Sequence, residues 1–293
     1  MKIGFIGAGR MGFTLGKHLT EQKEHEVVGF YSKTLASAKE AAEFTDTKYY
    51  EDLEKLVFDA DALFLTVPDG QIAEMAKMLD PMMLSTNDKI LCHTSGALSS
   101  QVFSGMHNQI FGYSIHPIYA VNSKLTSYEG FRDCFITLEG RPEYLPMWEK
   151  LFVSLGHKVK IIAASDKVKY HSSAVFASNL VVGLYQAACE LLMECGFEHE
   201  EAECALSTLF LNNAKNIVTY GTKDALTGPV QRCDIETVKK HLMVLEGDKL
   251  TSYQAISKIL AELAKSKALE QNQRGNTGEE EIRKAYEKLK KML

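Results

Sequence analysis

The sequence KIGFIGAGRMG at residues 2–12 places a glycine-rich turn directly after a short apolar run. Its glycines fit the spacing G-x-G-x-x-G, in which the first permits a tight turn and the second lets backbone approach a pyrophosphate. The third permits close packing of helix on strand, and the helix N-terminus then faces the phosphates. This context predicts a dinucleotide-binding loop made by Gly7, Gly9, Arg10, Met11 and Gly12.

Short apolar runs alternate with helical patterns from residue 1 to about residue 140. The runs 2–7, 26–32, 61–67, 88–94 and 109–116 are rich in β-branched and aromatic residues, which favours strands. Between them lie amphipathic segments such as 69–79, for which Asp69 is the expected N-cap. This alternation predicts a parallel, doubly wound sheet of Rossmann type covered on both faces, which 133–140 and 158–163 are candidates to extend.

Strand patterns stop after about residue 165, and long helical patterns follow. They cover 166–195, 198–219, 235–246, 250–266 and 278–293, the last with Thr277 and Glu280 in capping-box positions. The sequence therefore predicts a Rossmann-type α/β domain over 1–164 and an all-α domain over 165–293. The helices 198–219 and 250–266 carry more apolar surface than one long helix can obviously cover, which predicts a homodimer formed through the helical domain.

The composition is that of an ordinary globular protein. Hydrophobic residues make up 45%, charged residues 24%, and the formal net charge is −5, so nucleic acid and anionic membrane are not expected partners. The apolar run 174–189 is too short to span a bilayer, and we expect it to form a buried helix.

The cysteines indicate the compartment. The six cysteines form no CxxC pair and no signal peptide precedes the first strand, which predicts a reduced, cytoplasmic chain. One cluster could suggest a metal site, namely Cys189, Cys195, His199 and Cys204. Its spacing matches no zinc site, so we expect its cysteines to be buried core thiols and no metal to bind there.

The end of the second predicted strand decides which dinucleotide is favoured. Sites that prefer NAD place an Asp or Glu there, about 20 residues after the glycines, to hold the ribose 2′-hydroxyl. This chain has Ser32, Lys33 and Thr34, a cation and two hydroxyls that suit a 2′-phosphate, although such a lysine can also be a solvated turn residue. The sequence thus favours NADP over NAD, with Val67 and Pro68 at another strand end passing near the cofactor.

Two further strand ends carry side chains suited to chemistry. In a doubly wound sheet the ligand lies beyond the carboxyl ends of the strands, where HTSGA (93–97) places Ser95 and SIHPIYA (114–120) places His116. His93 is a weaker candidate. A histidine at a strand end often bonds only nearby backbone, so a structural role for both imidazoles stays open.

The helix that follows the predicted Rossmann domain begins with DKVKYHSSAVFASN (166–179). At 100° per residue Lys167 and His171 share a face, and Ser178 lies close to the same line. Asn179 is within reach of that side, and an amide among apolar residues must find hydrogen-bond partners. The stretch is either part of a reacting site or the polar start of a core helix.

A second polar group lies in ALTGPVQRCDIETVKKHL (225–242). Gly228 and Pro229 predict a turn, and Asp234 is the expected N-cap of the following helix. Arg232, just before that cap, either pairs locally with Asp234 or binds a substrate carboxylate in bidentate fashion.

In this order, GAGRMG, TVPD, HTSGALSS, HPIYA, DKVKYHSSAVFASN and LTGPVQRCDIETVKKHL resemble the motifs of a family of two-domain proteins. In that family a Rossmann-like NADP-binding domain precedes domain of unknown function 2520, within the pyrroline-carboxylate reductase and 6-phosphogluconate dehydrogenase-like superfamily. The resemblance implies an NADP cofactor and an all-α C-terminal domain of the 6-phosphogluconate dehydrogenase type. The family turn usually reads GPxxRGD, and Cys233 replaces its second glycine here.

More distant resemblances imply roles for single residues. The chain is similar to β-hydroxyacid dehydrogenases, which use a lysine and an asparagine on the corresponding helix, and this implies Lys167 and Asn179. It is also similar to prephenate dehydrogenases, whose strand-end serine and histidine imply Ser95 and His116.

These observations favour an NADP-dependent oxidoreductase that transfers a hydride to or from a small carboxylated metabolite with a carbonyl, imine or hydroxyl carbon. His171 or Lys167 would be the acid–base group. The residues expected to orient or anchor the substrate are Ser95, His116, Ser178, Asn179 and Arg232. The alternatives are an NADP-binding sensor or scaffold without turnover, and a deazaflavin-linked NADP oxidoreductase.

Overall fold

The computed structural model describes residues 1–22, 24–84, 88–106, 110–272 and 278–293. The chain divides into two compact units, Met1–Ser178 and Asn179–Leu293, and each has its own hydrophobic core. The sequence places the domain boundary after residue 164, whereas the compact units divide after Ser178. The first helix after the sheet, 167–177, therefore groups with the sheet.

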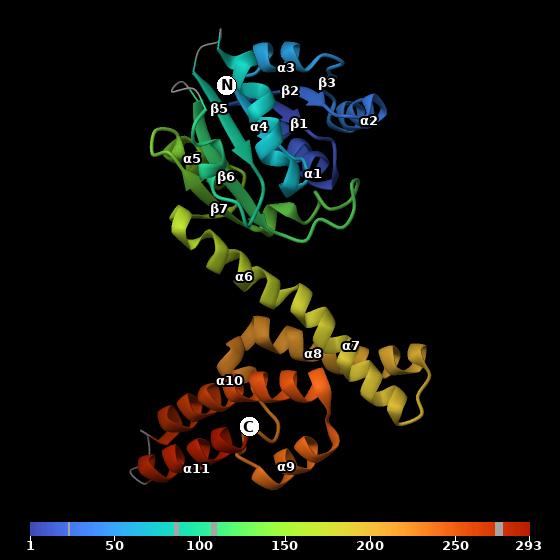
Figure 1. The fold of residues 1–293 in the computed structure, drawn as a ribbon, viewed down its shortest axis with the longest axis vertical. Coiled ribbons are helices and arrows are strands. Elements are labelled where there is room, and N and C mark those ends of the chain that lie inside the picture. The colour runs from blue at the N-terminus through green and yellow to red at the C-terminus, as the bar shows by residue number, and fades with distance from the viewer. Residues whose placement is uncertain (23, 85–87, 107–109, 273–277) are drawn as a thin grey trace. The chain divides into compact units, whose positions relative to one another are not determined.

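An eight-stranded sheet organises the first unit (Figure 1). In chain order its strands are β1 (Lys2–Ile6), β2 (Glu26–Tyr31), β3 (Lys48–Tyr49), β4 (Ala62–Leu65), β5 (Lys89–His93), β6 (Ile110–Ile118), β7 (Phe135–Gly140) and β8 (Lys158–Ile161). Across the sheet they run β3-β2-β1-β4-β5-β6-β7-β8. The predicted extension of the sheet by 133–140 and 158–163 is confirmed.

The pairing is mostly parallel, as Rossmann-type alternation predicts, with one exception. β6 and β7 are antiparallel, and their register places His116 opposite Thr137. This antiparallel pair departs from the predicted parallel arrangement, because the connection 119–134 between β6 and β7 contains no crossover α-helix.

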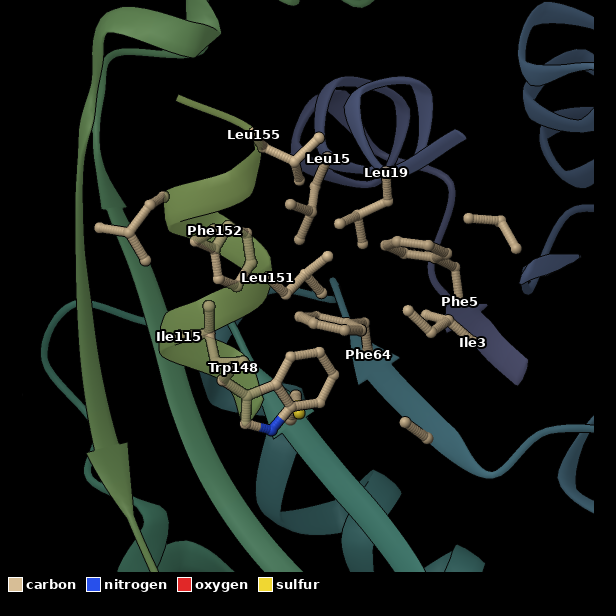
Figure 2. Packing of buried hydrophobic residues seen from close by; sticks show 14 of the residues in the cluster. Ile3, Phe5, Leu15, Leu19, Phe64, Ile115, Trp148, Leu151, Phe152 and Leu155 are labelled. Atoms are coloured by element: carbon tan, nitrogen blue, oxygen red, sulfur yellow. The ribbon is translucent and has the colours of Figure 1, made fainter. Parts of the chain in front are cut away.

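Helices cover both faces of the sheet. On one face α1 (Arg10–Thr20), α2 (Leu35–Thr45) and α5 (Leu145–Ser154) bury their apolar stripes, and on the other lie α3 (Leu53–Asp59) and α4 (Asp69–Met83). Figure 2 shows Trp148, Leu151 and Phe152 of α5 packed beside Phe64 and Ile115 of the sheet. Burying each such large side chain contributes about 1.5–3 kcal/mol to folding. The predicted doubly wound architecture is confirmed.

The last helix of the first unit is α6 (Lys167–Ala177), and the described part of the second unit is helical. Its helices are α7 (Asn179–Glu194), α8 (His199–Ala225), α9 (Ile235–Val244), α10 (Gly247–Asn272) and α11 (Glu279–Met292). The predicted all-α C-terminal region is confirmed. Its core joins α9, α10 and α11 through residues such as Val238, Ala261 and Leu289.

The predicted end of the second helix at residue 219 falls next to a kink in α8, where Gly221 has φ +80°. The expected capping-box residue Thr277 lies outside the described residues, and Gly278 is the N-cap of α11.

The apolar run 174–189 is exposed or half-buried except for Cys189, so the prediction of a buried helix is wrong. Ser178 has non-helical backbone angles (φ −129°, ψ −81°) and separates α6, of 11 residues, from α7, of 16. By length and composition Ala164–Glu194 could cross a membrane, with a mean hydropathy of 1.4 and 6% of its apolar window buried. Neither helix alone reaches the roughly 20 residues that a span requires. Cys189 is buried as expected, but Cys195 and Cys204 are exposed.

Candidate active site

The glycine-rich loop forms the turn between β1 and α1. Gly7 has φ +107°, and its N–H donates to the carbonyl of Tyr31 on β2 at 2.8 Å. A Cβ atom at Gly7 would lie 2.7 Å from Thr66 O, and one at Gly12 would lie 2.5 Å from Gly7 O. At Gly9 the nearest such atom would be 3.9 Å away. The packing of the chain itself therefore requires glycine at 7 and 12, whereas Gly9 leaves room through which a ligand can approach the backbone.

The helix after this loop offers unpaired donors to an anion. The N-cap of α1 is Gly9, no side chain caps the helix, and its first turn carries no acidic residue. The exposed Arg10 and half-buried Met11 begin this helix, and Val67 and Pro68 follow β4, the neighbour of β1 in the sheet. An uncapped helix N-terminus beside an open glycine fits the pyrophosphate of a dinucleotide.

The end of β2 also leads into a helix whose N-terminus has no side-chain cap. Ser32 is half-buried, while Lys33 and Thr34 are exposed. Thr34 is the N-cap of α2, its side chain makes no cap hydrogen bond, and the first turn of α2 has no acidic residue. A cation and an uncapped helix N-terminus fit an additional phosphate better than they fit a ribose 2′-hydroxyl, which a carboxylate would hold.

Lys167 is the buried centre of a second polar group in the first unit. It lies on α6 and is 1% exposed. Its Nζ donates to Ser95 O at 3.0 Å and to Ser114 Oγ at 2.7 Å. Ser95 follows β5, and Ser114 lies on β6 opposite the last residue of β5. The lysine thus ties α6 to the sheet where β5 ends.

The charge of Lys167 is only partly compensated. Burial lowers the pKa of the Lys167 ammonium to about 8, and the negative charges of Glu139 and Asp69 oppose this shift. Glu139 is itself buried and accepts hydrogen bonds from Ser100 N at 2.7 Å and Ser100 Oγ at 2.6 Å. A lysine with a pKa near 8 can give or take a proton close to neutral pH, which general acid–base chemistry requires.

Ser95 holds the loop after β5 by its hydroxyl. Its Oγ donates to Asp69 Oδ2 at 2.6 Å and accepts from the N–H groups of Ala97 and Leu98 at 3.2 and 3.0 Å. The prediction that Asp69 caps α4 is wrong, because Pro68 is the N-cap and Asp69 is the first helical residue. The proline N-cap has no side-chain acceptor, and the Asp69 carboxylate binds Ser95.

Two histidines from different elements converge on Gly96. A Cβ atom at Gly96 would lie 2.6 Å from Nδ1 of His171, on α6, and 2.8 Å from Nε2 of His116, on β6. The other ring nitrogen of His116, Nδ1, lies 2.5 Å from Tyr170 Oη. The Nδ1 atom of His171 is buried and has no hydrogen-bond partner among the described residues.

Burial keeps two of the imidazoles neutral. Burial, with a smaller contribution from the positive charge of Lys167, lowers the pKa of His93 to about 4 and that of His116 to about 3. His93 packs against Phe103 at a ring-centroid distance of 5.6 Å, and its Nδ1 accepts from Ser95 N at 3.2 Å.

The structure brings together Ser95, His116, Lys167 and His171 from the predicted catalytic set. Ser178 ends the first unit, and its Oγ donates to Ala174 O at 2.7 Å. Asn179 begins α7 in the second unit and is exposed. The predicted burial of its amide is wrong, because the helix break at Ser178 replaces the expected continuous core helix.

The predicted turn before α9 lies in the second unit. Cys233 has φ +55°, a left-handed conformation that favours glycine, which accounts for the glycine usual at this position in the related turn. Asp234 caps α9 by accepting from Thr237 N at 3.1 Å, so the predicted cap is confirmed. Arg232 is exposed. Hydrogen bonds from Thr237 lower the pKa of Asp234, and the charge of Arg232 adds a smaller contribution.

Some residues of the buried group have only a weak signal in the sequence. Tyr170 follows Lys167 at i+3, so helical spacing alone places it on the same side of α6. Gly96 follows the predicted Ser95, and Ser114 lies two residues before the predicted His116. Small residues are common at such positions, so neither indicates a site by itself. The contact between Asp69 and Ser95 joins residues 26 apart in sequence and depends on the packing of α4.

Comparison with known protein families finds a match in each half of the chain. A family model described as a Rossmann-like domain matches residues 1–117, and one described as domain of unknown function DUF2520 matches residues 134–260. A search of curated proteins found no match.

Solved structures share the fold over most of the chain. Protein TM1727 from Thermotoga maritima is 27% identical, with a TM-score of 0.71 over 91% of this chain and 99% of its own. A candidate NADP oxidoreductase from Bacteroides fragilis, BF3122, is 24% identical, with a TM-score of 0.64 over 90% and 96%. The pyrroline carboxylate reductase of Plasmodium falciparum, solved with NADP bound, is 14% identical, with a TM-score of 0.52 over 100% and 98%. The chain thus consists of a Rossmann-like domain followed by a DUF2520 domain, in a fold shared with NAD(P)-dependent oxidoreductases.

Proposed function

We propose that this protein is an NADP-dependent oxidoreductase acting on a small, carboxylated metabolite. The observation that carries the proposal is the group formed by the buried Lys167 and the half-buried His116 and His171, at the carboxyl ends of β5 and β6. In a doubly wound sheet this edge is where ligands bind, and the glycine-rich loop after β1 opens on the same edge.

The cofactor site supports the choice of a dinucleotide. NADPH, when bound, would supply the hydride, held by the N-terminus of α1 and by Arg10 at its pyrophosphate. Lys33 and Thr34 would hold the 2′-phosphate at the N-terminus of α2. The absence of a carboxylate at residues 32–34 supports NADP over NAD.

The chain's own residues supply the proton chemistry. A protonated Lys167 has three N–H donors, and Ser95 O and Ser114 Oγ accept two of them. The third N–H can donate a hydrogen bond to a substrate oxygen or nitrogen at which charge develops. The low polarity around the amine holds its pKa near 8, so the proton can be delivered and recovered at neutral pH.

The role of Arg232 as a carboxylate anchor stays a prediction, since Arg232 belongs to the second unit. Its test is a substitution to Lys, which keeps the charge but loses the planar fork. Loss of affinity for a carboxylated substrate with unchanged NADPH affinity would support the anchor.

Cofactor titration is the first test of the proposal. We expect NADPH to bind about 10- to 150-fold more tightly than NADH, the equivalent of one charge-assisted phosphate contact of about 1.5–3 kcal/mol. Lys33→Ala should remove most of this preference, whereas Lys55→Ala, an exposed lysine on α3, should leave it unchanged. Equal affinities of the wild-type protein for the two nucleotides would reject the assignment of NADP.

Turnover distinguishes an enzyme from a nucleotide sensor. NADPH absorbance should fall with one member of a panel of 2-oxo acids and cyclic imino acids, or NADP⁺ should be reduced by one of a panel of hydroxy acids. A protein that binds NADPH tightly, responds to a panel member by thermal shift and turns none over is the sensor of the alternative hypothesis.

A further inference from the structure

Tyr170 and His116 form a hydrogen-bonded pair in the first unit. The Oη atom of Tyr170 lies 2.5 Å from Nδ1 of His116, and the two rings are nearly perpendicular, at 85° with centroids 5.5 Å apart. Tyr170 is on α6, one turn after the buried Lys167, and His116 is on β6. The contact therefore depends on the same docking of α6 on the sheet that buries the lysine.

The direction of this hydrogen bond follows from the chemistry of the two groups. Burial holds the pKa of His116 near 3, so the ring is neutral at physiological pH and has one N–H. A phenol is a stronger acid than a neutral imidazole, and an imidazole nitrogen is a good acceptor. The favoured arrangement has Tyr170 donating to Nδ1, which leaves the single proton of His116 on Nε2.

The Nε2 atom of His116 faces Gly96 together with Nδ1 of His171. Both nitrogens lie within 3 Å of the point that a Cβ atom at Gly96 would occupy, so a larger residue there would displace both rings. Their separation is at most the sum of 2.6 and 2.8 Å, which one oxygen at about 2.8 Å from each nitrogen can bridge. The buried Nδ1 of His171 has no hydrogen-bond partner within the described part of the chain. An oxygen at this place would be that partner.

We propose that Tyr170 is a positioning residue that fixes His116 as its Nε2–H tautomer, and that His116 and His171 together hold one oxygen of the substrate beside Gly96. The identity of that oxygen as part of a substrate rests on the proposed oxidoreductase function. The tautomer of His116 does not depend on the proposed function. An experiment can therefore reject the oxidoreductase function and leave the role of Tyr170 intact, or the reverse.

A second tyrosine–histidine pair provides a matched control. In the second unit Tyr253 Oη lies 2.9 Å from Nδ1 of His241, with centroids 5.6 Å apart and rings at 88°. Tyr253→Phe therefore removes an equivalent hydroxyl from an equivalent pair outside the candidate active site. Comparing it with Tyr170→Phe separates the effect on His116 from the general cost of losing a tyrosine hydroxyl.

The tautomer is read from long-range ¹H–¹⁵N correlation spectra of the full-length protein with NADP⁺ and ¹⁵N-labelled histidine. We expect a single Nε2–H pattern for His116 in the wild type and in Tyr253→Phe, and a tautomer mixture in Tyr170→Phe. An Nδ1–H form or a mixture in the wild type, or an unchanged pattern in Tyr170→Phe, would overturn the positioning role.

The oxygen site is tested in the same spectra with acetate, a minimal carboxylate, as the probe. Saturable shifts of both His116 Nε2 and His171 Nδ1 are expected, with affinity reduced at least threefold in Tyr170→Phe and unchanged in Tyr253→Phe. A shift of neither ring, or of one alone, would overturn the two-histidine site. These spectra need no turnover, so a protein that shows both shifts and reduces no substrate would contradict the proposed function and leave this inference intact.

Discussion

Nζ of Lys167 lies 2.7 Å from Oγ of Ser114, and this contact joins the first turn of α6 to the strand beside β5. The side chain is almost completely buried, and its second acceptor is the backbone carbonyl of Ser95. A buried lysine without a carboxylate in direct contact is costly for folding, because its charge is desolvated. Such a cost is typical of a functional site, where the group is kept for its chemistry.

Replacing Lys167 by Met should strongly lower the turnover rate while leaving the protein folded. The methionine keeps the apolar stem and removes a desolvated charge, so we expect the free energy of unfolding to change by about 1 kcal/mol or less. If Lys167 transfers the proton, the turnover rate should fall by roughly 100-fold or more. The measurements are nicotinamide absorbance and thermal unfolding.

Lys169→Met is the matched control, because Lys169 is an exposed lysine two residues away on the same helix. It should change neither rate nor stability. Equal turnover in the two variants and in the wild type would remove Lys167 from the proton chemistry.

The lowered pKa of Lys167 gives a specific pH dependence. If its ammonium is the acid in the reductive direction, kcat/KM should fall as pH rises through about 8, and the oxidative direction should show the opposite trend. Profiles in both directions test the assignment, and two profiles with the same slope near pH 8 would contradict it.

The same pKa links folding to pH. Between about pH 8 and the ordinary value of 10.5, the unfolded chain keeps the proton that the folded chain has lost. Stability from this group therefore rises with pH across that window, by roughly 3 kcal/mol at most, and no further above it. Other groups also titrate there, so the quantity to measure is the difference between the wild type and Lys167→Met in urea unfolding at pH 7 and pH 10. A difference independent of pH would show that the pKa of Lys167 is not lowered.

Local chemistry made the glycine-rich loop and α6 predictable. The turn at Gly7 requires a left-handed backbone, and a close approach fixes Gly12, so the motif itself carries the geometry. Lys167 and His171 are four residues apart on a helix, so their shared face follows from helical spacing. In both cases the residues that matter are near one another in sequence.

Contacts between distant elements were not predictable from such patterns. The Ser95–Asp69 and His116–Tyr170 hydrogen bonds depend on how α4 and α6 pack on the sheet, which no periodicity specifies. Apolar content also failed as a guide to burial in 174–189. A stretch can be apolar because a partner covers it, and the sequence of one chain does not distinguish this from burial in its own core.

Two glycines of the loop, Gly9 and Gly12, should separate folding from cofactor binding. Gly9→Ala adds a methyl group that meets no atom of the chain closer than 3.9 Å, so it should fold normally. It should still weaken NADPH binding by at least tenfold if backbone approaches the pyrophosphate at that position. Gly12→Ala would bring a Cβ atom to 2.5 Å from Gly7 O and should lower the unfolding temperature as well. Fluorescence titration and thermal unfolding of both variants decide this, and a Gly9→Ala protein with wild-type affinity would refute the assigned loop.

The exposed apolar residues of α8 predict a homodimer formed through the helical unit. Leu209, Leu211 and Val218 are 68%, 64% and 87% exposed, and α7 adds Val182. Such large apolar side chains would be covered if a second copy of the same helices paired with them about a two-fold axis.

Light scattering of the dilute wild-type protein should give twice the chain mass of 32.7 kDa. Val218→Asp should shift the equilibrium to the monomer, because it would bury an unpaired carboxylate in the predicted interface. Phe58→Asp is the control, since Phe58 is 78% exposed on α3 of the first unit, outside the predicted interface. It should leave the dimer intact. A wild-type protein that is monomeric at micromolar concentration, or a Phe58→Asp variant that dissociates as readily as Val218→Asp, would rule out dimerisation through α8.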